Sequence, residues 1–230
     1  MNSARCRVII PALNEEEAIT KVIKDIPDSI VSEVIVVDNG SSDNTKNEAE
    51  AAGATVLSEP LRGYGAACLR GIAYVKDSAA DTDIIVFLDA DYSDHPEELP
   101  SVIKPILEDD IDLVIGSRAL GESEKGSLTP VQAFGNWLSA KLLDLIYNAK
   151  FTDLGPFRAI KFNKLLALNM QDKNYGWTVE MQVKAAKQKL SFTEVPVKYR
   201  NRIGKSKVSG TVKGSILAGY KILYTIFKNI

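Results

Sequence analysis

Short apolar runs alternate with stretches of helical periodicity through the first half of the chain. These runs predict buried strands at residues 7–12, 33–38, 54–57, 83–89 and 112–116. The fourth run is apolar throughout between its terminal aspartates, which is typical of a strand whose two faces are both covered. Because helical segments lie between the runs, the order predicts an α/β fold with a mostly parallel central sheet and helices on both faces.

The pattern changes after Gly121. A polar loop at residues 122–127 comes first. Helices are then expected near residues 130–147, 164–169 and 178–188, and a late strand at residues 192–197. We expect one domain over residues 1–210 and a C-terminal amphipathic helix over residues 211–230.

The C-terminal segment has a wide apolar face and three charges. Its apolar positions at helical spacing are Ile216, Leu217, Tyr220, Leu223, Tyr224 and Phe227, and its charges are Lys213, Lys221 and Lys228. Two interpretations stay open. The helix packs on the domain or on a partner subunit in a homodimer, or it lies in a membrane interface.

Composition narrows the class of protein. The chain has 230 residues, of which 45% are hydrophobic and 25% charged, so it can form a globular core. The net charge of -2 argues against a general nucleic-acid binder. Five basic residues nevertheless fall within ten positions near the C-terminus, at Lys198, Arg200, Arg202, Lys205 and Lys207. They form either a solvated surface or a loop that faces an anion.

Cysteine usage and hydropathy bear on location. Cys6 and Cys68 have no metal-binding spacing and do not make a disulfide framework, so we interpret both as reduced packing residues. This fits a cytoplasmic location. The N-terminal residues show no apolar signal core, and no run of eighteen apolar residues predicts a spanning helix.

Polar residues follow three of the predicted strands. Asp38, Asp89 and the pair Ser117-Arg118 come at or just after strand ends. In open parallel sheets, ligands bind at the carboxyl ends of the strands, so these clusters should meet in one crevice. Asp89-Ala90-Asp91 carries two carboxylates, which can hold a hard divalent cation such as Mg²⁺ or Mn²⁺ against a diphosphate. A helix-capping Asp beside a turn Asp is the alternative, but a carboxylate ending a buried strand must face a crevice or lose solvation.

Other motifs are less specific. Asp38 can accept hydrogen bonds from a base or ribose, or it can form a turn. Gly63-Tyr64-Gly65 can let the backbone approach a phosphate or sugar, although the Rossmann and Walker glycine patterns are both absent. His95 is the only histidine, which excludes a histidine metal cage, and no Gly-x-Ser-x-Gly elbow occurs.

The second half offers an aromatic residue and two further acids. Trp177 with Asp153 and Glu180 could bind a sugar and activate a hydroxyl group. Equally, Trp177 could be a core anchor and Glu180 an exposed helix residue. The residues alone do not separate these interpretations.

Together the motifs resemble the inverting family 2 glycosyltransferases of GT-A fold, most closely the polyprenyl- or dolichyl-phosphate mannosyl- and glucosyltransferase branch. The matching segments run in family order and include Asp38-Asn39-Gly40-Ser41, Asp89-Ala90-Asp91 and Gly155-Pro156-Phe157-Arg158. They lie at residues 8–15, 36–43, 63–65, 88–91, 116–118, 153–158, 194–197 and 202–207. The resemblance implies a metal-dependent transfer of a hexose from a UDP- or GDP-sugar.

The resemblance also implies roles for individual residues. It assigns the nucleotide-sugar pocket to Pro11, Leu13, Glu15, Asp38, Gly65 and Ala90. It assigns Mg²⁺ or Mn²⁺ and the diphosphate to Asp89 and Asp91. It assigns donor or acceptor phosphates to Arg118, Arg158, Arg202 and Lys207. The implied acceptor is a polyprenyl phosphate, with the protein peripheral on the cytoplasmic face of the membrane. Such an acceptor is already anionic, so a strong base is less necessary. A hydroxyl acceptor would instead need Asp153 or Glu180 as base.

Three residues depart from the usual family pattern, and two other functions stay open. Asn39 stands where many members have a second Asp, Ser93 where the mannosyl branch often has a coordinating Gln, and Pro156 interrupts a frequent Gly-Phe-Arg. A sugar-1-phosphate nucleotidyltransferase would usually have a glycine-rich loop where this chain has residues 11–14. A non-catalytic nucleotide-sugar binding module is the other alternative.

Overall fold

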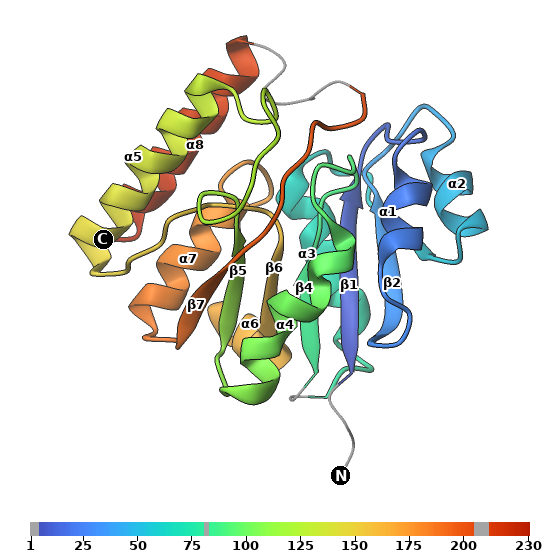
Figure 1. The fold of residues 1–230 in the computed structure, drawn as a ribbon, viewed down its shortest axis with the longest axis horizontal. Helices are drawn as coiled ribbons and strands as arrows, with labels where there is room; N and C mark the ends of the chain where they lie inside the picture. Colours follow the sequence, from blue (N-terminus) through green and yellow to red (C-terminus); the bar gives the residue numbers. More distant parts are fainter. Residues whose placement is uncertain (1–4, 81–82, 205–211) are drawn as a thin grey trace.

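The computed structural model describes residues 5–80, 83–204 and 212–230 as a three-layer α/β structure (Figure 1). The strands are β1 (Cys6–Ala12), β2 (Val31–Asp38), β3 (Thr55–Ser58), β4 (Ile84–Phe87), β5 (Leu113–Ser117), β6 (Arg158–Lys161) and β7 (Phe192–Pro196). The helices of the first half are α1 (Ile19–Asp25), α2 (Thr45–Ala51), α3 (Tyr64–Val75), the 3₁₀ turn η1 (Pro96–Glu98) and α4 (Leu99–Glu108). The later helices are α5 (Pro130–Tyr147), α6 (Phe162–Leu168), α7 (Trp177–Lys187) and α8 (Val212–Lys228).

The sheet has the order β3-β2-β1-β4-β6-β5-β7. The predicted α/β class and the mostly parallel sheet are confirmed, because β6 alone among the described strands runs antiparallel to its neighbours β4 and β5. This strand is absent from our sequence prediction. It starts at Arg158 and ends at Lys161, and two charged ends around two apolar residues give no strand signal.

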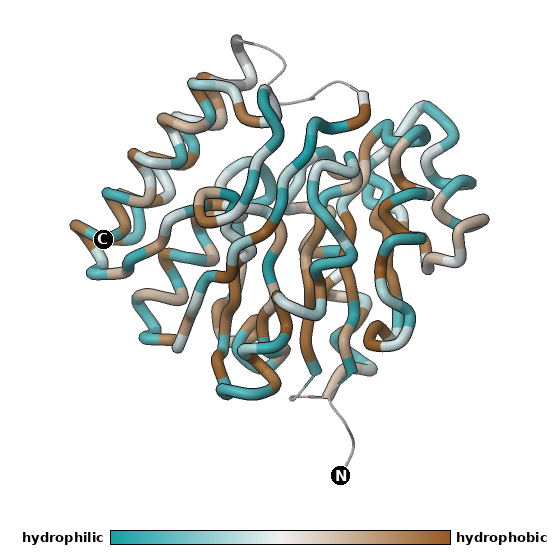
Figure 2. Tube along the Cα trace, viewed as in Figure 1, coloured by the Kyte–Doolittle hydropathy of each residue, from teal (hydrophilic) through white to brown (hydrophobic). Residues whose placement is uncertain are grey.

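Alternate strand residues build two apolar layers. In β1, Ile9 packs in the layer that includes α3, α5 and α7, whereas Val8 and Ile10 pack against α1 and α4. All three are fully buried, as expected for a strand with both faces covered. Figure 2 shows the apolar residues concentrated along the central strands. The carboxyl ends of the parallel strands therefore lie together at one edge, where the predicted polar clusters sit.

The C-terminal helix packs on the domain. Ile226 is fully buried, and the Tyr147 hydroxyl of α5 donates to the Ile226 carbonyl at 2.5 Å. Figure 1 shows α8 alongside α5 at one end of the molecule. Five apolar residues of α8 are exposed, so packing on the domain does not use all its apolar positions: Ile216, Leu217, Tyr220, Tyr224 and Phe227. The boundary at residue 210 lies outside the described residues and stays a prediction.

Glycine at position 65 is required by a close backbone approach. A Cβ atom there would lie 2.0 Å from the Asp172 carbonyl oxygen. We therefore expect Gly65→Ala to lower the free energy of unfolding by about 2 kcal/mol, since the backbone of residues 172–173 must move. Gly135→Ala in α5 is the control: its Cβ would meet nothing within 4 Å, and it should stabilise by up to about 1 kcal/mol. Urea unfolding measures both, and equal midpoints for the two variants would contradict this packing.

Candidate active site

A cavity of about 1320 Å³ opens at the carboxyl ends of the parallel strands. The predicted site residues that line it are Pro11, Leu13, Glu15, Asp89, Ala90, Asp91, Arg118, Asp153 and Arg202. Residues following β1, β4 and β5 thus meet in one crevice, as the strand-end argument predicts. Asn39, in the turn after β2, also lines the cavity.

Four predicted residues do not line this cavity in the part of the chain that the structure describes: Asp38, Gly65, Arg158 and Glu180. Asp38 is 8% exposed, and its Oδ1 accepts a hydrogen bond from the Ser41 amide at 3.0 Å, so it takes part in the turn after β2; its contact with a base or ribose stays a prediction. Lys207 lies outside the described residues. At Gly65 the close neighbour is the backbone of residues 172–173.

Glu180 organises a segment beneath the site. Its carboxylate accepts hydrogen bonds from the amides of Gln171 and Asp172, at 2.7 Å for Asp172, and it forms an ion pair with Lys184 at 2.8 Å. The side chain is nearly buried in these contacts. This arrangement holds residues 171–172 against α3 and leaves Glu180 away from any substrate in the cavity.

Arg158 is also structural. It is fully buried, and its guanidinium donates to the carbonyl oxygens of Leu154, Gly155 and Thr178. Burial lowers the pKa of Arg158 to about 10. The arginine thus ties the loop before β6 to the start of α7, instead of facing a phosphate.

The two acids after β4 form the polar centre. Asp91 is 5% exposed, and its Oδ1 accepts from the Ser93 amide at 2.9 Å and from the Ser93 hydroxyl at 2.5 Å. The buried Oδ1 of Asp89 has no hydrogen-bond partner among the described residues. Burial and then the Asp91 carboxylate raise the pKa of Asp89 to about 7. Two carboxylates that repel each other favour a cation beside them, and the unpartnered oxygen of Asp89 is available to one.

A divalent cation fits these two acids. Among the described residues, no group of three His, Cys, Asp or Glu side chains could hold a metal ion. Mg²⁺ is commonly bound by one or two carboxylates together with substrate phosphates, so Asp89 and Asp91 suffice if a diphosphate supplies further oxygens. Their hard oxygen atoms suit Mg²⁺ or Mn²⁺.

Asp94 is a third acid at this centre that our sequence analysis did not assign. It is 1% exposed, and its Oδ2 lies 3.5 Å from the Asp89 amide. Burial, followed by the charges of Asp89 and Asp91, raises the pKa of Asp94 well above its usual range. The sequence signal for this role was the position of Asp94 five residues after Asp89, because one tight turn brings it back to the end of β4.

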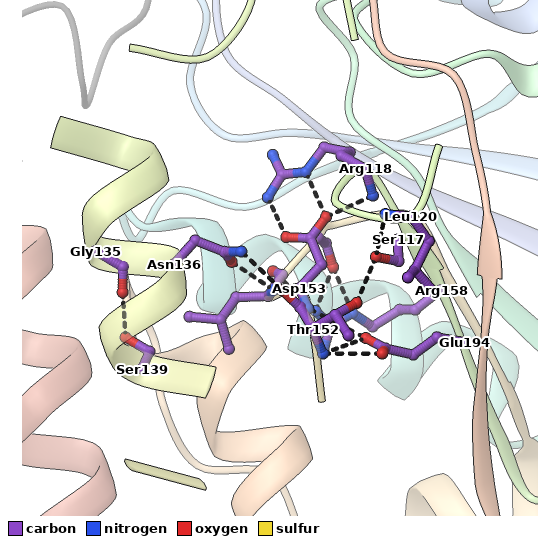
Figure 3. A network of polar contacts seen from close by, with 12 residues as sticks. Ser117, Arg118, Leu120, Gly135, Asn136, Ser139, Thr152, Asp153, Arg158 and Glu194 are labelled. Atoms are coloured by element: carbon purple, nitrogen blue, oxygen red, sulfur yellow. Dashed lines mark hydrogen bonds and ion pairs between the residues drawn. The ribbon is translucent and has the colours of Figure 1, made fainter. Parts of the chain in front are cut away.

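Arg118 and Asp153 form a bidentate ion pair on the other wall (Figure 3). Nε and the Arg118 amide donate to Oδ2 of Asp153 at 2.8 and 2.7 Å, and Nη2 donates to Oδ1 at 2.7 Å. Burial alone would raise the pKa of Asp153, but the Arg118 guanidinium outweighs it and holds the pKa below the usual range. Asp153 is therefore a poor proton acceptor.

Glu194 supports this pair from β7. Its carboxylate accepts from the Thr152 amide at 2.8 Å and the Asp153 amide at 3.1 Å (Figure 3). The Ser117 and Thr152 hydroxyl groups share a hydrogen bond of 2.7 Å beside it. The loop that carries Asp153 is thereby fixed to β5 and β7.

Asn39 explains one departure from the usual family pattern. Its Nδ2 donates to the carbonyl oxygens of Glu59 and Leu61 at 2.9 and 2.8 Å, and its Oδ1 accepts from the Gly63 amide at 2.7 Å. An aspartate could not make the two donations. At this position the amide therefore holds the loop before α3.

Residues 7–167 match the profile of glycosyl transferase family 2, which covers more than half of the chain. The chain belongs to glycosyl transferase family 2. An uncharacterized glycosyltransferase of Mycobacterium tuberculosis is 36% identical over 213 residues, covering 92% of this chain and 93% of the relative. The undecaprenyl-phosphate mannosyltransferase of Micrococcus luteus is 29% identical over 222 residues, covering 91% and 90%.

Solved structures agree with the family. Glucosyl-3-phosphoglycerate synthase from Mycobacterium tuberculosis, in complex with Mn²⁺, UDP and glucosyl-3-phosphoglycerate, has a TM-score of 0.77. It is 25% identical, and the match covers 99% of this chain and 80% of that chain. As a family 2 glycosyltransferase of GT-A fold, the chain is an enzyme. Membership favours a glycosyltransferase over a sugar-1-phosphate nucleotidyltransferase.

Proposed function

We propose that this glycosyltransferase moves a hexose from a UDP- or GDP-sugar to a polyprenyl phosphate, with inversion and with the help of Mg²⁺ or Mn²⁺. Asp89 and Asp91 would hold the cation, which when bound neutralises the charge that develops on the departing diphosphate. Mn²⁺ and UDP occur together in the similar glucosyl-3-phosphoglycerate synthase. This supports both the metal and a nucleoside diphosphate.

The chain's own residues would position the reactants. Pro11, Leu13 and Glu15 would lie along the nucleotide, and Arg118 at the acceptor phosphate. One phosphate oxygen of the acceptor would attack the anomeric carbon as the bond from that carbon to the donor diphosphate breaks. The bonding electron pair would leave with the diphosphate. Because attack and departure take place on opposite faces of the sugar, the configuration inverts.

The lining of the cavity carries the proposal for the acceptor. Part of it is formed by apolar residues of α5 and α8: Val131, Phe134, Trp137, Leu138, Ala218, Gly219, Ile222 and Leu223. A polyprenyl chain has the apolar surface that these residues would bury. Relatives that are named for a polyprenyl-phosphate acceptor, such as the undecaprenyl-phosphate mannosyltransferase, support the same class.

The ion pair on the acceptor side favours an anionic nucleophile. A hydroxyl acceptor would need a base, but Asp153 is bound by Arg118 and Glu180 is not at the cavity. A phosphate needs no deprotonation at neutral pH. Nε and Nη2 of Arg118 are held by Asp153, which fixes the guanidinium so that its remaining N–H groups would meet a phosphate oxygen.

A donor screen tests the proposal. The protein is incubated with UDP- and GDP-hexoses, undecaprenyl phosphate and Mn²⁺, and the released nucleotide is measured. We expect release with one base, and loss of release when a chelator removes the cation. Nucleotide release that is unaffected by the chelator would contradict the role of the metal.

Exposed apolar residues of α5 and α8, some of which also border the cavity, support a peripheral membrane location. Phe134 and Trp137 of α5 are 61% and 54% exposed, and Ile216 and Tyr220 of α8 are both 66% exposed. Among the described residues, no helix is long and apolar enough to cross a membrane. We propose that this apolar face lies in the headgroup region of a bilayer, where aromatic side chains are favoured and where the acceptor lipid is present.

Vesicle flotation checks the membrane face. Phe134→Glu combined with Trp137→Glu should abolish flotation with vesicles of phosphatidylcholine and phosphatidylglycerol, because two charges would enter the interface. Leu107→Glu is the matched control: it is 59% exposed on α4 and should float like the unchanged protein. Equal flotation of both variants would refute the membrane face. A dimer that dissociates only in the double variant would assign the face to a second subunit.

A further inference from the structure

The Arg202 guanidinium lies on the acids of the candidate metal site. Its Nη2 is 2.9 Å from Oδ2 of Asp91 and 3.3 Å from Oε1 of Glu15. The two acidic side chains are 7% and 8% exposed, so both are largely withdrawn from water. The arginine supplies the positive charge that these acids need within the protein itself.

Backbone contacts hold Arg202 in this position. The Ile203 amide donates to the Asp91 carbonyl and the Arg200 amide to the Ser93 carbonyl, each at 2.9 Å. Tyr199 and Asp94 also form a β-bridge. Residues 199–203 therefore run alongside residues 91–94 like a short strand. Arg202 is placed by the chain itself and not by its side chain alone.

These contacts engage both carboxylate oxygens of Asp91. Oδ1 accepts two hydrogen bonds from Ser93, and Oδ2 pairs with Arg202. A divalent cation that binds at Oδ2 would lie close to the guanidinium, and like charges a few ångströms apart repel strongly in a poorly solvated site. Direct coordination therefore requires Arg202 to leave Oδ2.

We propose that Arg202 is a resident counter-cation that the metal ion must replace, so that the metal binds efficiently only together with a diphosphate. The diphosphate brings negative charge, to which the displaced guanidinium can turn, and the charge of the site stays balanced. A metal ion alone offers Arg202 no such partner. The proposal rests on the metal site of the proposed function and adds an order of binding to it.

Binding of Mn²⁺ alone tests this exchange. The free Mn²⁺ signal in electron paramagnetic resonance is followed while nucleotide-free protein is titrated. Arg202→Gln should bind Mn²⁺ about tenfold or more tightly than the unchanged protein, because the competing charge is gone. Arg202→Lys keeps a cation and should stay close to the unchanged protein. Lys198→Gln removes an equal charge from the same segment at an exposed position and should change nothing.

Addition of UDP or GDP should reverse the order of the Mn²⁺ affinities of the two proteins. The unchanged protein should then bind Mn²⁺ more tightly than Arg202→Gln, since the guanidinium would meet the diphosphate. Equal or weaker Mn²⁺ binding by nucleotide-free Arg202→Gln would overturn the exchange, and so would tightening of the same size in Lys198→Gln. Circular dichroism confirms that each variant is folded.

The result of the Mn²⁺ titration does not depend on whether the proposed transfer reaction takes place. The titration contains no sugar and no acceptor, so failure to transfer a hexose to polyprenyl phosphate leaves its result standing. Conversely, if transfer depends on Mn²⁺ but Arg202→Gln does not bind free Mn²⁺ more tightly, the proposed function survives and the exchange fails.

Discussion

Asp91→Asn is expected to lower metal-dependent transfer by about 10²–10³-fold, because the cation would lose one of two charged protein ligands and the diphosphate its neutralisation. Asparagine keeps an oxygen that can accept from Ser93, and Arg202, whose side chain is 30% exposed, keeps Glu15 as a partner at 3.3 Å. The free energy of unfolding should therefore change by no more than about 1 kcal/mol. Transfer rates at saturating donor, together with urea unfolding, measure both quantities.

A matched variant separates the loss of a negative charge from the loss of a metal ligand. Asp109→Asn removes an equal charge at an exposed position after α4, and it should leave the rate unchanged. If Asp91→Asn retained the full Mn²⁺-dependent rate, Asp91 would not be a metal ligand. A large loss of stability would instead make Asp91 a structural residue.

Asp153→Asn should be the most destabilising change at the site. Asp153 is 1% exposed, and its loss leaves the Arg118 guanidinium without a counter-charge, which costs about 3 kcal/mol or more. Since Arg118 would lose its orientation, the KM for the acceptor should rise more than kcat falls. A general base would give the opposite result, with a collapse of kcat and little change in stability.

The pH dependence has a definite sign. The pKa of Asp153 is lowered in the folded protein, because the Arg118 guanidinium outweighs the effect of burial. The pair therefore contributes stability above the unfolded pKa of about 3.9, and this contribution is lost as pH falls through the lower folded pKa. The stability gap between unchanged protein and Asp153→Asn should be full at pH 7 and shrink in acid.

Asp112→Asn provides the control for this variant. Asp112 is 9% exposed and pairs with Lys161 at 3.3 Å at the start of β5, away from the strand ends that carry the site. Its replacement should cost stability without raising the KM for the acceptor. If Asp112→Asn and Asp153→Asn changed that KM equally, the ion pair with Arg118 would have no specific role at the acceptor.

The parallel part of the sheet could be predicted because its strands are apolar on both faces. Ile84–Phe87 is an example, since covered strands leave a continuous apolar run in the sequence. The strand β6 could not be predicted in this way. Its first residue, Arg158, is fully buried, and its guanidinium donates to the carbonyls of Leu154 and Gly155 in the preceding loop and of Thr178 in α7. The partner in α7 comes from the tertiary fold, and a charged residue at the start of a four-residue strand gives no strand signal in the sequence.

The candidate site shows the same division. Asp89, Asp91 and Arg118 follow strands, so topology alone brings them to the cavity. Glu180 was a candidate base because the sequence does not reveal which groups an acid in a helix contacts. In the structure its carboxylate accepts hydrogen bonds from backbone amides. Trp177 is 1% exposed and packs edge-on against Phe87, as its interpretation as a core anchor predicts, although it also borders the cavity.

The most direct measurement compares two acceptors that differ only in the phosphate. The protein is given Mn²⁺, its sugar nucleotide and either a polyprenyl phosphate or the polyprenol of the same chain length, and the glycosylated lipid is quantified. We predict transfer to the phosphate and none above background to the alcohol, because Asp153, the candidate base at the cavity, is held by the Arg118 guanidinium. Equal transfer to the polyprenol would contradict an anionic acceptor and restore a general base to the mechanism.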